Sequence, residues 1–595
     1  MAEVKVKKGG GTKRRVTRPA VRRAAKLGSE MAIVIRNSAR SRSRTTDQAA
    51  DVAVVRVLNG ASRAGSVELV PGTGRRFKVP REQWEEVRGD LKTLVRDELA
   101  PLDAQAREAV LDSLAESTAL DGRGSFELSS SLYSIREVLR ERLPRGAVSE
   151  DHPAGLAVEE VLAVDECSFW INGWMHDADG LGEVTVVSPE GARVVVNGDA
   201  HRHQRPDVVQ FYSGLGIEGS RDHGFTVLVV LPGPSLLSSG WIAELRTADG
   251  TQLEIQCPEV VRDPQIVRST ILGELDNYQR EISGPLTANH GHRALERLQM
   301  RIVAESEIDS VDTYGKPPTN PKLSIVIPLY KRIDFIEHQL LQFCRDPDFE
   351  EVELVYVLDS SEQADALAGQ AHDLFALYGL PFRVVNLSSA GGFAAANNHG
   401  IEVSKGKRLL LLNSDVIPDR PGWMSAMSEF YDQTPGIGAL GPKLLYEDGS
   451  LQHAGLYFHR AAGSQIWENA HCFKGLHRTL AAANIARPVP AVTAACMMID
   501  REAYEQVGGL PLHYVQGDYE DSELCIRLWE AGRTSWYLPS VELFHLEGQS
   551  YLPGVRRIPS EYNMWLHTHL HRRRIEELMA DFDPHLPTQP DRREA

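Results

Sequence analysis

Between residues 323 and 412 the chain alternates short apolar runs with helical segments, and this alternation limits the folds open to it. Four runs are too short to be buried helices, and we expect them to be strands: Leu323–Tyr330, Glu353–Asp359, Pro381–Leu387 and Leu409–Leu412. The three segments between them are predicted to be helices: Ile333–Phe343, Ala364–Tyr378 and Gly391–Val403. Repeated strand-helix-strand units of this length form a mostly parallel sheet with helices on both faces. We therefore predict an α/β domain.

Polar residues follow three of these predicted strands. Tyr330 and Asp359 end two of them, and Asp415 closes the triplet Asn413-Ser-Asp that follows the four leucines. Because ligands of open α/β sheets bind at the carboxyl ends of the strands, we expect these side chains at one edge. A carboxylate there suits a divalent cation held against phosphate oxygens. A simple turn is the local alternative for the triplet, because its residue types favour turns.

The 595 residues are enough for several domains. We expect a basic disordered tail, a small α+β module whose helices include 81–99, a β-sandwich-like domain of short strands, a helical linker, the α/β domain, and a C-terminal helix and tail. The predicted boundaries are 1–46, 47–150, 155–262, 263–320, 321–555 and 556–595. The linker ends in the proline-rich stretch 314–321. Trp170 and Trp241, in sandwich strands, are expected in the core rather than stacked on sugar rings.

The charge distribution and the cysteines bear on the cellular location and the partners of the protein. Residues 1–45 carry fourteen Lys or Arg against two Glu, whereas the whole chain has a net charge of −17. Such a tail suits anionic lipid head groups or nucleic acid, and a merely solubilising tail is an equal alternative. The six cysteines form no C-x-x-C pair, which favours reduced thiols in a cytoplasmic protein. We find no apolar run of membrane-spanning length and no secretory signal.

The second half of the chain resembles the family 2 glycosyltransferases, which have a GT-A nucleotide-sugar-binding fold. The resemblance covers about residues 320–555 and rests on six motifs in the family's order: Ser324-Ile-Val-Ile-Pro-Leu-Tyr330, Val357-Leu-Asp-Ser-Ser361, Gly391-Gly-Phe-Ala-Ala-Ala-Asn-Asn-His-Gly-Ile401, Asn413-Ser-Asp415, Tyr519-Glu-Asp-Ser-Glu-Leu-Cys-Ile-Arg527 and His545-Leu-Glu-Gly548. The GFAAANN-type segment and the NSD triplet resemble those of the branch of the family that builds bacterial surface polysaccharides, which includes rhamnosyltransferases.

The resemblance assigns roles to individual residues. It implies that Asp415 and His545 bind Mg²⁺ or Mn²⁺, which neutralises charge on the departing diphosphate. Asn413 stands where the family usually has a first carboxylate, so we expect weak metal affinity without nucleotide. The implied donor-binding residues are Pro328, Tyr330, Asp359, Gly392, Asn398, Asn413 and Ser414. For Asn398 the alternative is a place on a packed helix face.

Catalysis is assigned by the same resemblance to the acidic cluster at 518–521. An inverting transfer needs a base that takes the proton of the acceptor hydroxyl, and Asp521 matches the family's base. Glu520 beside it would position the acceptor or hold the loop. Adjacent carboxyls raise each other's pKa, which favours base function near neutral pH. An acidic first turn stabilised by the helix dipole is compatible with this role.

The sequence thus predicts a metal-dependent inverting glycosyltransferase. It would move a sugar from a UDP- or dTDP-sugar to a glycan or lipid-linked glycan acceptor in surface-polysaccharide synthesis. We expect it in the cytoplasm, at the inner face of the membrane if the basic tail binds lipid, and an oligomer is compatible with the β-sandwich. The rivals are a nucleotidyltransferase, against which stands the lack of a glycine-rich phosphate loop with lysine, and a non-catalytic glycan-binding scaffold.

Overall fold

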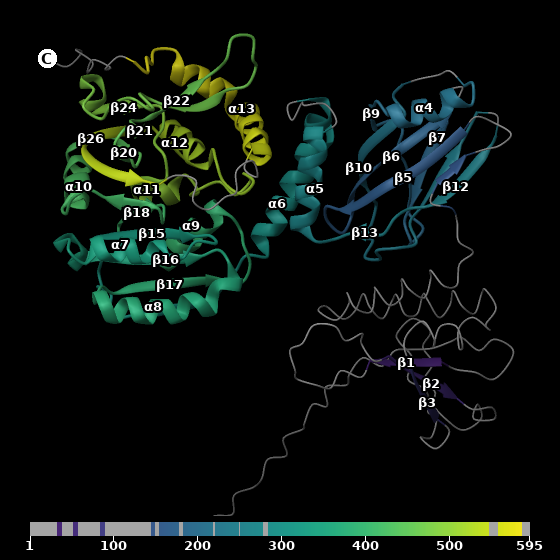
Figure 1. Ribbon diagram of the computed structural model, residues 1–595, viewed down its shortest axis with the longest axis horizontal. Helices are drawn as coiled ribbons and strands as arrows, with labels where there is room; N and C mark the ends of the chain where they lie inside the picture. Colours follow the sequence, from purple (N-terminus) through teal and green to yellow (C-terminus); the bar gives the residue numbers. More distant parts are fainter. Residues whose placement is uncertain are drawn as a thin grey trace, which may run out of the picture. The chain divides into compact units, whose positions relative to one another are not determined.

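The computed structural model divides the chain into two compact units, Met1–Arg262 and Asp263–Ala595 (Figure 1). The described residues are 144, 146–148, 154–177, 182–217, 221–248, 250–277, 284–546 and 557–585, with the backbone of 33–37, 52–57 and 84–89. No helix in these ranges is long and apolar enough to cross a membrane.

Three short strands near the N-terminus form an antiparallel sheet in the order β1-β2-β3. They are β1 (Ile33–Asn37), β2 (Val52–Val57) and β3 (Trp84–Gly89). Two expectations were wrong here: β1 lies in the tail predicted to be disordered, and β3 lies within the segment 81–99 predicted to be a helix. Pairing with β2 gives both strands backbone partners, and such tertiary pairing overrides weak local preferences. The other predictions for 1–143 lie outside the described residues.

The described residues from 146 to 261 form two sheets around one core, together with the short helix α4 (Pro206–Gly214). One sheet has the order β13-β5-β6-β10-β9, in which β13 is Val260–Val261, β10 is Gly224–Val230 and β9 is His201–His203. The other has the order β12-β11-β7-β8, formed by Gln252–Gln256, Ile242–Arg246, Glu183–Val187 and Arg193–Val195. The longest strands are β5 (Ala154–Ala163) and β6 (Ser168–Asp177), which pair antiparallel. Trp170 and Trp241 are fully buried, and Trp241 packs on Phe169 with ring centroids 4.5 Å apart. These side chains therefore belong to the core, and the sandwich-like class is confirmed.

The second unit is built on a mixed sheet in the order β14-β17-β16-β15-β18-β25-β20-β26-β19. Four neighbouring strands pair parallel to one another: β17 (Phe382–Leu387), β16 (Val352–Leu358), β15 (Leu323–Leu329) and β18 (Arg408–Leu412). They are followed by β25 (Cys496–Asp500), β20 (Ile437–Leu445), β26 (Thr534–His545) and β19 (Val416–Pro418). The predicted α/β class with a mostly parallel central sheet is confirmed.

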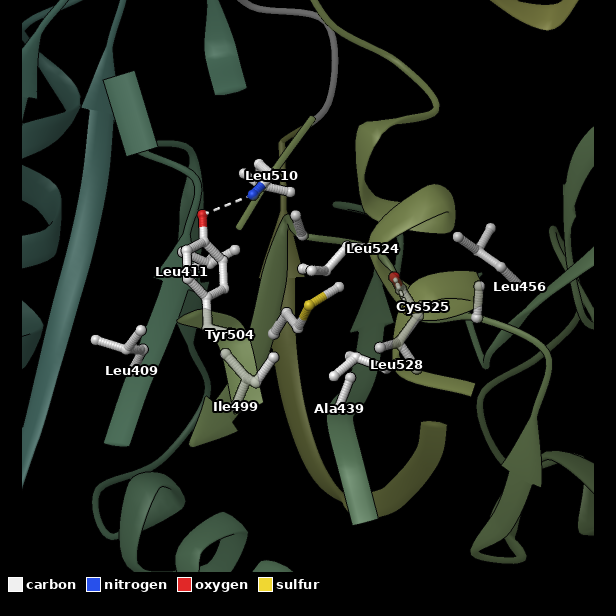
Figure 2. Packing of buried hydrophobic residues seen from close by; sticks show 14 of the residues in the cluster. Leu409, Leu411, Ala439, Leu456, Ile499, Tyr504, Leu510, Leu524, Cys525 and Leu528 are labelled. Carbon is white, nitrogen blue, oxygen red and sulfur yellow. Dashed lines mark hydrogen bonds between the residues drawn. The ribbon is translucent and has the colours of Figure 1, made fainter. Parts of the chain in front are cut away.

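The parallel strands are buried on both faces because their side chains alternate between two apolar cores. Leu409 and Leu411 join one core, and Leu410 and Leu412 join the other. The first core receives helices α9 (Phe393–Val403), α11 (Arg501–Gln506) and α12 (Glu520–Glu530) (Figure 2). The second receives α7 (Phe335–Phe343), α8 (Ala364–Tyr378) and α10 (Trp423–Gln433). The run of four leucines therefore forms a central strand, as predicted.

Strand β14 (Ile308–Tyr314) lies before the proline-rich stretch at which the sequence analysis places the domain boundary. It pairs antiparallel with β17 and extends the sheet. The sheet thus includes residues assigned to the linker, which also contains α5 (Pro264–Asn277) and α6 (His292–Ala304). Because β14 is largely exposed, its sequence lacks the apolar alternation by which a strand is found.

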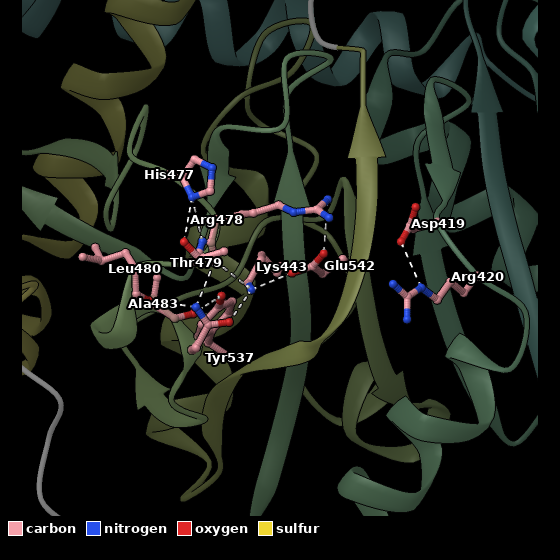
Figure 3. Close-up of polar contacts among 11 residues, drawn as sticks. Asp419, Arg420, Lys443, His477, Arg478, Thr479, Leu480, Ala483, Tyr537 and Glu542 are labelled. Atoms are coloured by element: carbon pink, nitrogen blue, oxygen red, sulfur yellow. Dashed lines mark hydrogen bonds and ion pairs between the residues drawn. The ribbon is translucent and has the colours of Figure 1, made fainter.

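A buried ion pair joins β20 to β26. Lys443 is fully buried, and its Nζ lies 2.8 Å from Glu542 Oε1 and donates to Asn484 Oδ1 at 2.7 Å (Figure 3). Arg478 lies 3.5 Å from the other carboxylate oxygen of Glu542. Because a buried charge without a partner is costly, the pair holds β26 in register three residues before His545.

Candidate functional site

A cavity of about 550 Å³ opens at the carboxyl ends of the parallel strands. Ten of the eleven predicted site residues line it: Pro328, Tyr330, Asp359, Gly392, Asn413, Ser414, Asp415, Glu520, Asp521 and His545. They come from the ends of β15, β16, β18 and β26, from the turn before α9 and from the first turn of α12. The fold therefore brings together side chains that are more than 200 residues apart in the chain.

Asp415 and His545 face each other on neighbouring strands. Val416 of β19 pairs with His545 of β26, and the amide of Leu546 donates to the Asp415 carbonyl at 3.0 Å. The imidazole Nε2 lies 3.3 Å from Asp415 Oδ1. The other ring nitrogen, Nδ1, lies 2.7 Å from the side-chain carbonyl of Gln452. Because that carbonyl can only accept, Nδ1 donates to it, and Nε2 is the nitrogen that faces Asp415.

This pair suits a divalent cation. A histidine that donates one ring N–H to a carbonyl and presents the other nitrogen has the arrangement typical of a metal ligand. Asn413 Oδ1, which belongs to a cavity-lining residue, is buried without a hydrogen-bond partner. Within the described ranges no cluster of three or more His, Cys, Asp or Glu could hold a metal. A cation held by Asp415 and His545 would therefore need further oxygen ligands.

Asp359 is buried and anchors the turn before α9. Its carboxylate accepts hydrogen bonds from the amides of Gly391 at 2.7 Å and Gly392 at 3.0 Å. Burial raises the pKa of Asp359 to about 7, and the two backbone hydrogen bonds only partly oppose this. Gly392 has φ of 92°, and a Cβ there would meet Gln516 O at 3.3 Å, so the turn requires glycine. The donor-binding role predicted for Asp359 stays a prediction.

Asn398 is the one predicted residue that does not line the cavity. Its Nδ2 donates to the Leu510 carbonyl at 2.9 Å, and its Oδ1 accepts from the Leu510 amide and from the Tyr504 hydroxyl. The Tyr504 hydroxyl is also 3.0 Å from the Leu510 amide (Figure 2). Asn398 therefore ties α9 to the segment after α11, which is the packed position considered as its alternative.

The acidic pair Glu520-Asp521 begins helix α12. Asp521 accepts hydrogen bonds from the amides of Ala494 at 3.1 Å and Ser522 at 2.7 Å, which set the direction of its carboxylate. Glu520 is buried, and its Oε2 has no hydrogen-bond partner. Burial raises the pKa of both groups above the ordinary carboxyl range, and the neighbouring carboxylates raise it further. A carboxylate so tuned accepts a proton more readily than an exposed one.

The family model for Glycosyl transferase family 2 matches residues 324–508, which contain the parallel strands and the Asn413-Ser-Asp triplet. The chain carries a family 2 glycosyltransferase domain. The GT-A class implied by the sequence motifs agrees with this match and with the sheet described above.

Three curated proteins are similar to part of this chain. The uncharacterized protein y4gI of Sinorhizobium fredii is 32% identical, over 39% of this chain and 25% of that protein. The O-antigen biosynthesis protein RfbC of Myxococcus xanthus is 30% identical, over 39% of this chain and 18% of that protein. The N-acetylglucosaminyl-diphospho-decaprenol L-rhamnosyltransferase of Mycobacterium tuberculosis is 31% identical, over 22% of this chain and 44% of that protein. The chain thus spans less than half of each relative.

Two solved structures show weaker similarity. GalNAc-T7 with UDP, GalNAc and Mn²⁺ has a TM-score of 0.34 and 13% identity, over 42% of this chain and 48% of that one. The mannosyltransferase PcManGT of Pyrobaculum calidifontis with GDP-Man and Mn²⁺ has a TM-score of 0.32 and 14% identity, over 51% of this chain and 76% of that one. Scores of this size carry no argument about the site.

Several residues that line this cavity carry no signal in the sequence. They come from segments outside the predicted strand ends: Gln265, Arg268, Gln452, Asn469, Lys474, Pro559 and Ser560. Gln265 and Arg268 lie on α5, and Pro559 and Ser560 lie on the C-terminal helix α13 (Arg557–Met579). Single polar residues on helices are usually solvated, so only the fold reveals them as part of the cavity wall.

Proposed function

We propose that the protein is an inverting glycosyltransferase that moves a sugar from a UDP- or dTDP-linked donor to a glycan acceptor in cell-surface polysaccharide synthesis. The observation that carries this proposal is the presence of two different kinds of site in one cavity: the Asp415–His545 pair and the Glu520–Asp521 pair. The first is suited to a cation and phosphates, and the second to proton transfer. The names of the relatives RfbC and the rhamnosyltransferase support the polysaccharide role.

On the donor side, Asp415 and His545 would hold Mg²⁺ or Mn²⁺. When bound, such a cation neutralises negative charge on the departing diphosphate. The unpaired Oδ1 of Asn413 can accept from a hydroxyl of the donor or from bound water. Pro328, Tyr330 and the Gly391-Gly392 turn would form the wall against the nucleotide.

On the acceptor side, Asp521 acts as the general base. Its carboxylate takes the proton of the acceptor hydroxyl, while the hydroxyl oxygen forms a bond to the anomeric carbon on the face opposite the nucleotide. The bond between that carbon and the diphosphate oxygen breaks, and the nucleoside diphosphate leaves with the electron pair. The configuration at the anomeric carbon is inverted. Glu520 would position the acceptor or support the loop.

The place of the reaction and its partners belong to the same proposal. Nucleotide-sugars and reduced cysteines indicate the cytoplasm, and the basic residues of 1–45 would bring the protein to anionic lipids that carry the acceptor. The chain covers less than half of each of these relatives, so its partners and location are proposed from its own residues.

The test is an assay of nucleoside diphosphate release with a panel of UDP- and dTDP-sugars, with and without Mn²⁺. We compare the wild-type protein with Asp521→Asn and with Glu530→Gln, an exposed residue on the same helix. We expect metal-dependent release from the wild type and from Glu530→Gln, and a loss of at least about 100-fold in Asp521→Asn. Nucleotide affinity should stay within about twofold.

Two results would overturn the proposal. Release of diphosphate from a nucleoside triphosphate and a sugar phosphate would indicate a nucleotidyltransferase. Binding of nucleotide-sugars without turnover at any metal concentration would indicate a non-catalytic scaffold.

A further inference from the structure

The segment that leads into the acidic pair has an unusual backbone. Gln516, Asp518 and Tyr519 have positive φ angles of 65°, 84° and 78°, although none of them is glycine. Side chains with a Cβ rarely adopt this region, and such residues persist only where the surrounding structure holds them. Tyr519 is also the N-cap residue of α12, so the strained segment ends where Glu520 and Asp521 begin.

One side chain outside the family match holds this segment. Asn563 of α13 is fully buried. Its Oδ1 accepts from the Val515 amide at 2.9 Å, and its Nδ2 lies 3.0 Å from the Val515 carbonyl, 2.8 Å from that of Gly517 and 3.3 Å from that of Asp518. The amide thus copies the pairing of a strand edge and closes the segment against the helix.

The segment held by Asn563 reaches both halves of the cavity. At one end the Gln516 carbonyl accepts from the Phe393 amide at 3.2 Å, directly after the turn anchored by Asp359. At the other end the segment leads into the first turn of α12 and so fixes the position of the Asp521 carboxylate. Ser560, three residues before Asn563 on α13, lines the same cavity. A change at Asn563 would therefore move the base relative to the donor wall.

We propose that Asn563 is a positioning residue, which holds residues 515–518 so that Asp521 is aligned with the acceptor hydroxyl. This makes the first turns of α13 part of the catalytic apparatus. The inference rests on the proposed function, because it assumes that Asp521 is the base. Replacing Asn563 should lower the rate of transfer without lowering nucleotide affinity, since Asp415 and His545 keep their contacts and Asp359 still anchors the Gly391-Gly392 turn.

The experiment compares Asn563→Ala with Ile575→Ala. Ile575 is also fully buried on α13, and it packs in the apolar core without bonding to the segment. Both variants should lower thermal stability. Only Asn563→Ala should lower kcat, by about 10-fold to 100-fold, because small misplacements of reacting groups cost rates of this order. The Kd for UDP with Mn²⁺ should stay within about twofold in both. Hydrogen exchange of the amides of 515–522 should become faster in Asn563→Ala alone.

The proposal is overturned if Asn563→Ala keeps the wild-type kcat, or if Ile575→Ala loses as much. Unchanged exchange at 515–522 in Asn563→Ala would also overturn it. If the wild-type protein transfers no sugar, the proposed function fails and the alignment of a base falls with it. Exchange of the segment then still decides whether Asn563 holds it, so the two failures are distinguishable.

Discussion

At the scale of single residues, the site depends on side chains whose environment differs from water. Asp359 is the clearest case, because it is buried at a strand end and bonded to two backbone amides. Near neutral pH this carboxyl is therefore divided between the ionised form, which accepts both amide hydrogen bonds of the Gly391-Gly392 turn, and the protonated form. Gln452 shows the same dependence, since its carbonyl decides which nitrogen of His545 faces the cavity.

The raised pKa of Asp359 predicts a pH dependence of stability. Its folded-state pKa is about 7 and the usual value is near 3.8, so the folded protein binds the proton more tightly than the unfolded chain. Stability should therefore fall as pH rises between these values, by about 2–3 kcal/mol from pH 5 to pH 7.5. Urea unfolding of wild type and Asp359→Asn at both pH values measures this. The variant should lack this part of the slope, and equal slopes in the two proteins would contradict the assignment.

At the scale of elements, the sheet was predictable where strands are buried on both faces. The run Leu409–Leu412 predicts a central strand, because only apolar side chains fit between two apolar cores. Strand β14 was missed because it lies at an exposed edge, and β1 and β3 because backbone pairing outweighs their local preferences. Lys443 on β20 gave no sequence signal either, since a lysine in a strand is normally exposed.

Lys443 offers a test at this scale. Replacing it with Met removes one partner of a buried pair and leaves Glu542 near Arg478 alone. We expect a loss of about 2–3 kcal/mol of unfolding free energy, somewhat less than for a fully buried pair, because Glu542 is partly exposed. The exposed pair of Lys322 with Glu351 is the matched control, and Lys322→Met should cost under about 1 kcal/mol. Similar losses in both variants would show that the buried pair does not anchor β26.

At the scale of the whole molecule, the site exists only because the second unit folds around it. The motifs at Asp359, Asp415, Asp521 and His545 are readable in the sequence, since each follows a strand or opens a helix. Asn398 carries the motif pattern but packs against Leu510, because a helix turns one face to the core and the sequence does not show which side chain faces the cavity. Asn563 lies on a helix with no motif, and only its four contacts reveal it.

The central claim is that Asp415 takes part in binding a nucleoside diphosphate together with a divalent cation. The most direct measurement is titration calorimetry of UDP and dTDP, with and without Mn²⁺, on the wild-type protein and on Asp415→Asn. Asp419→Asn, four residues further along and outside the cavity lining, is the control. We predict that Mn²⁺ tightens binding of one nucleotide at least about 10-fold in wild type and Asp419→Asn, and leaves it unchanged in Asp415→Asn. No nucleotide binding, or the same effect of Mn²⁺ in all three proteins, would contradict the claim.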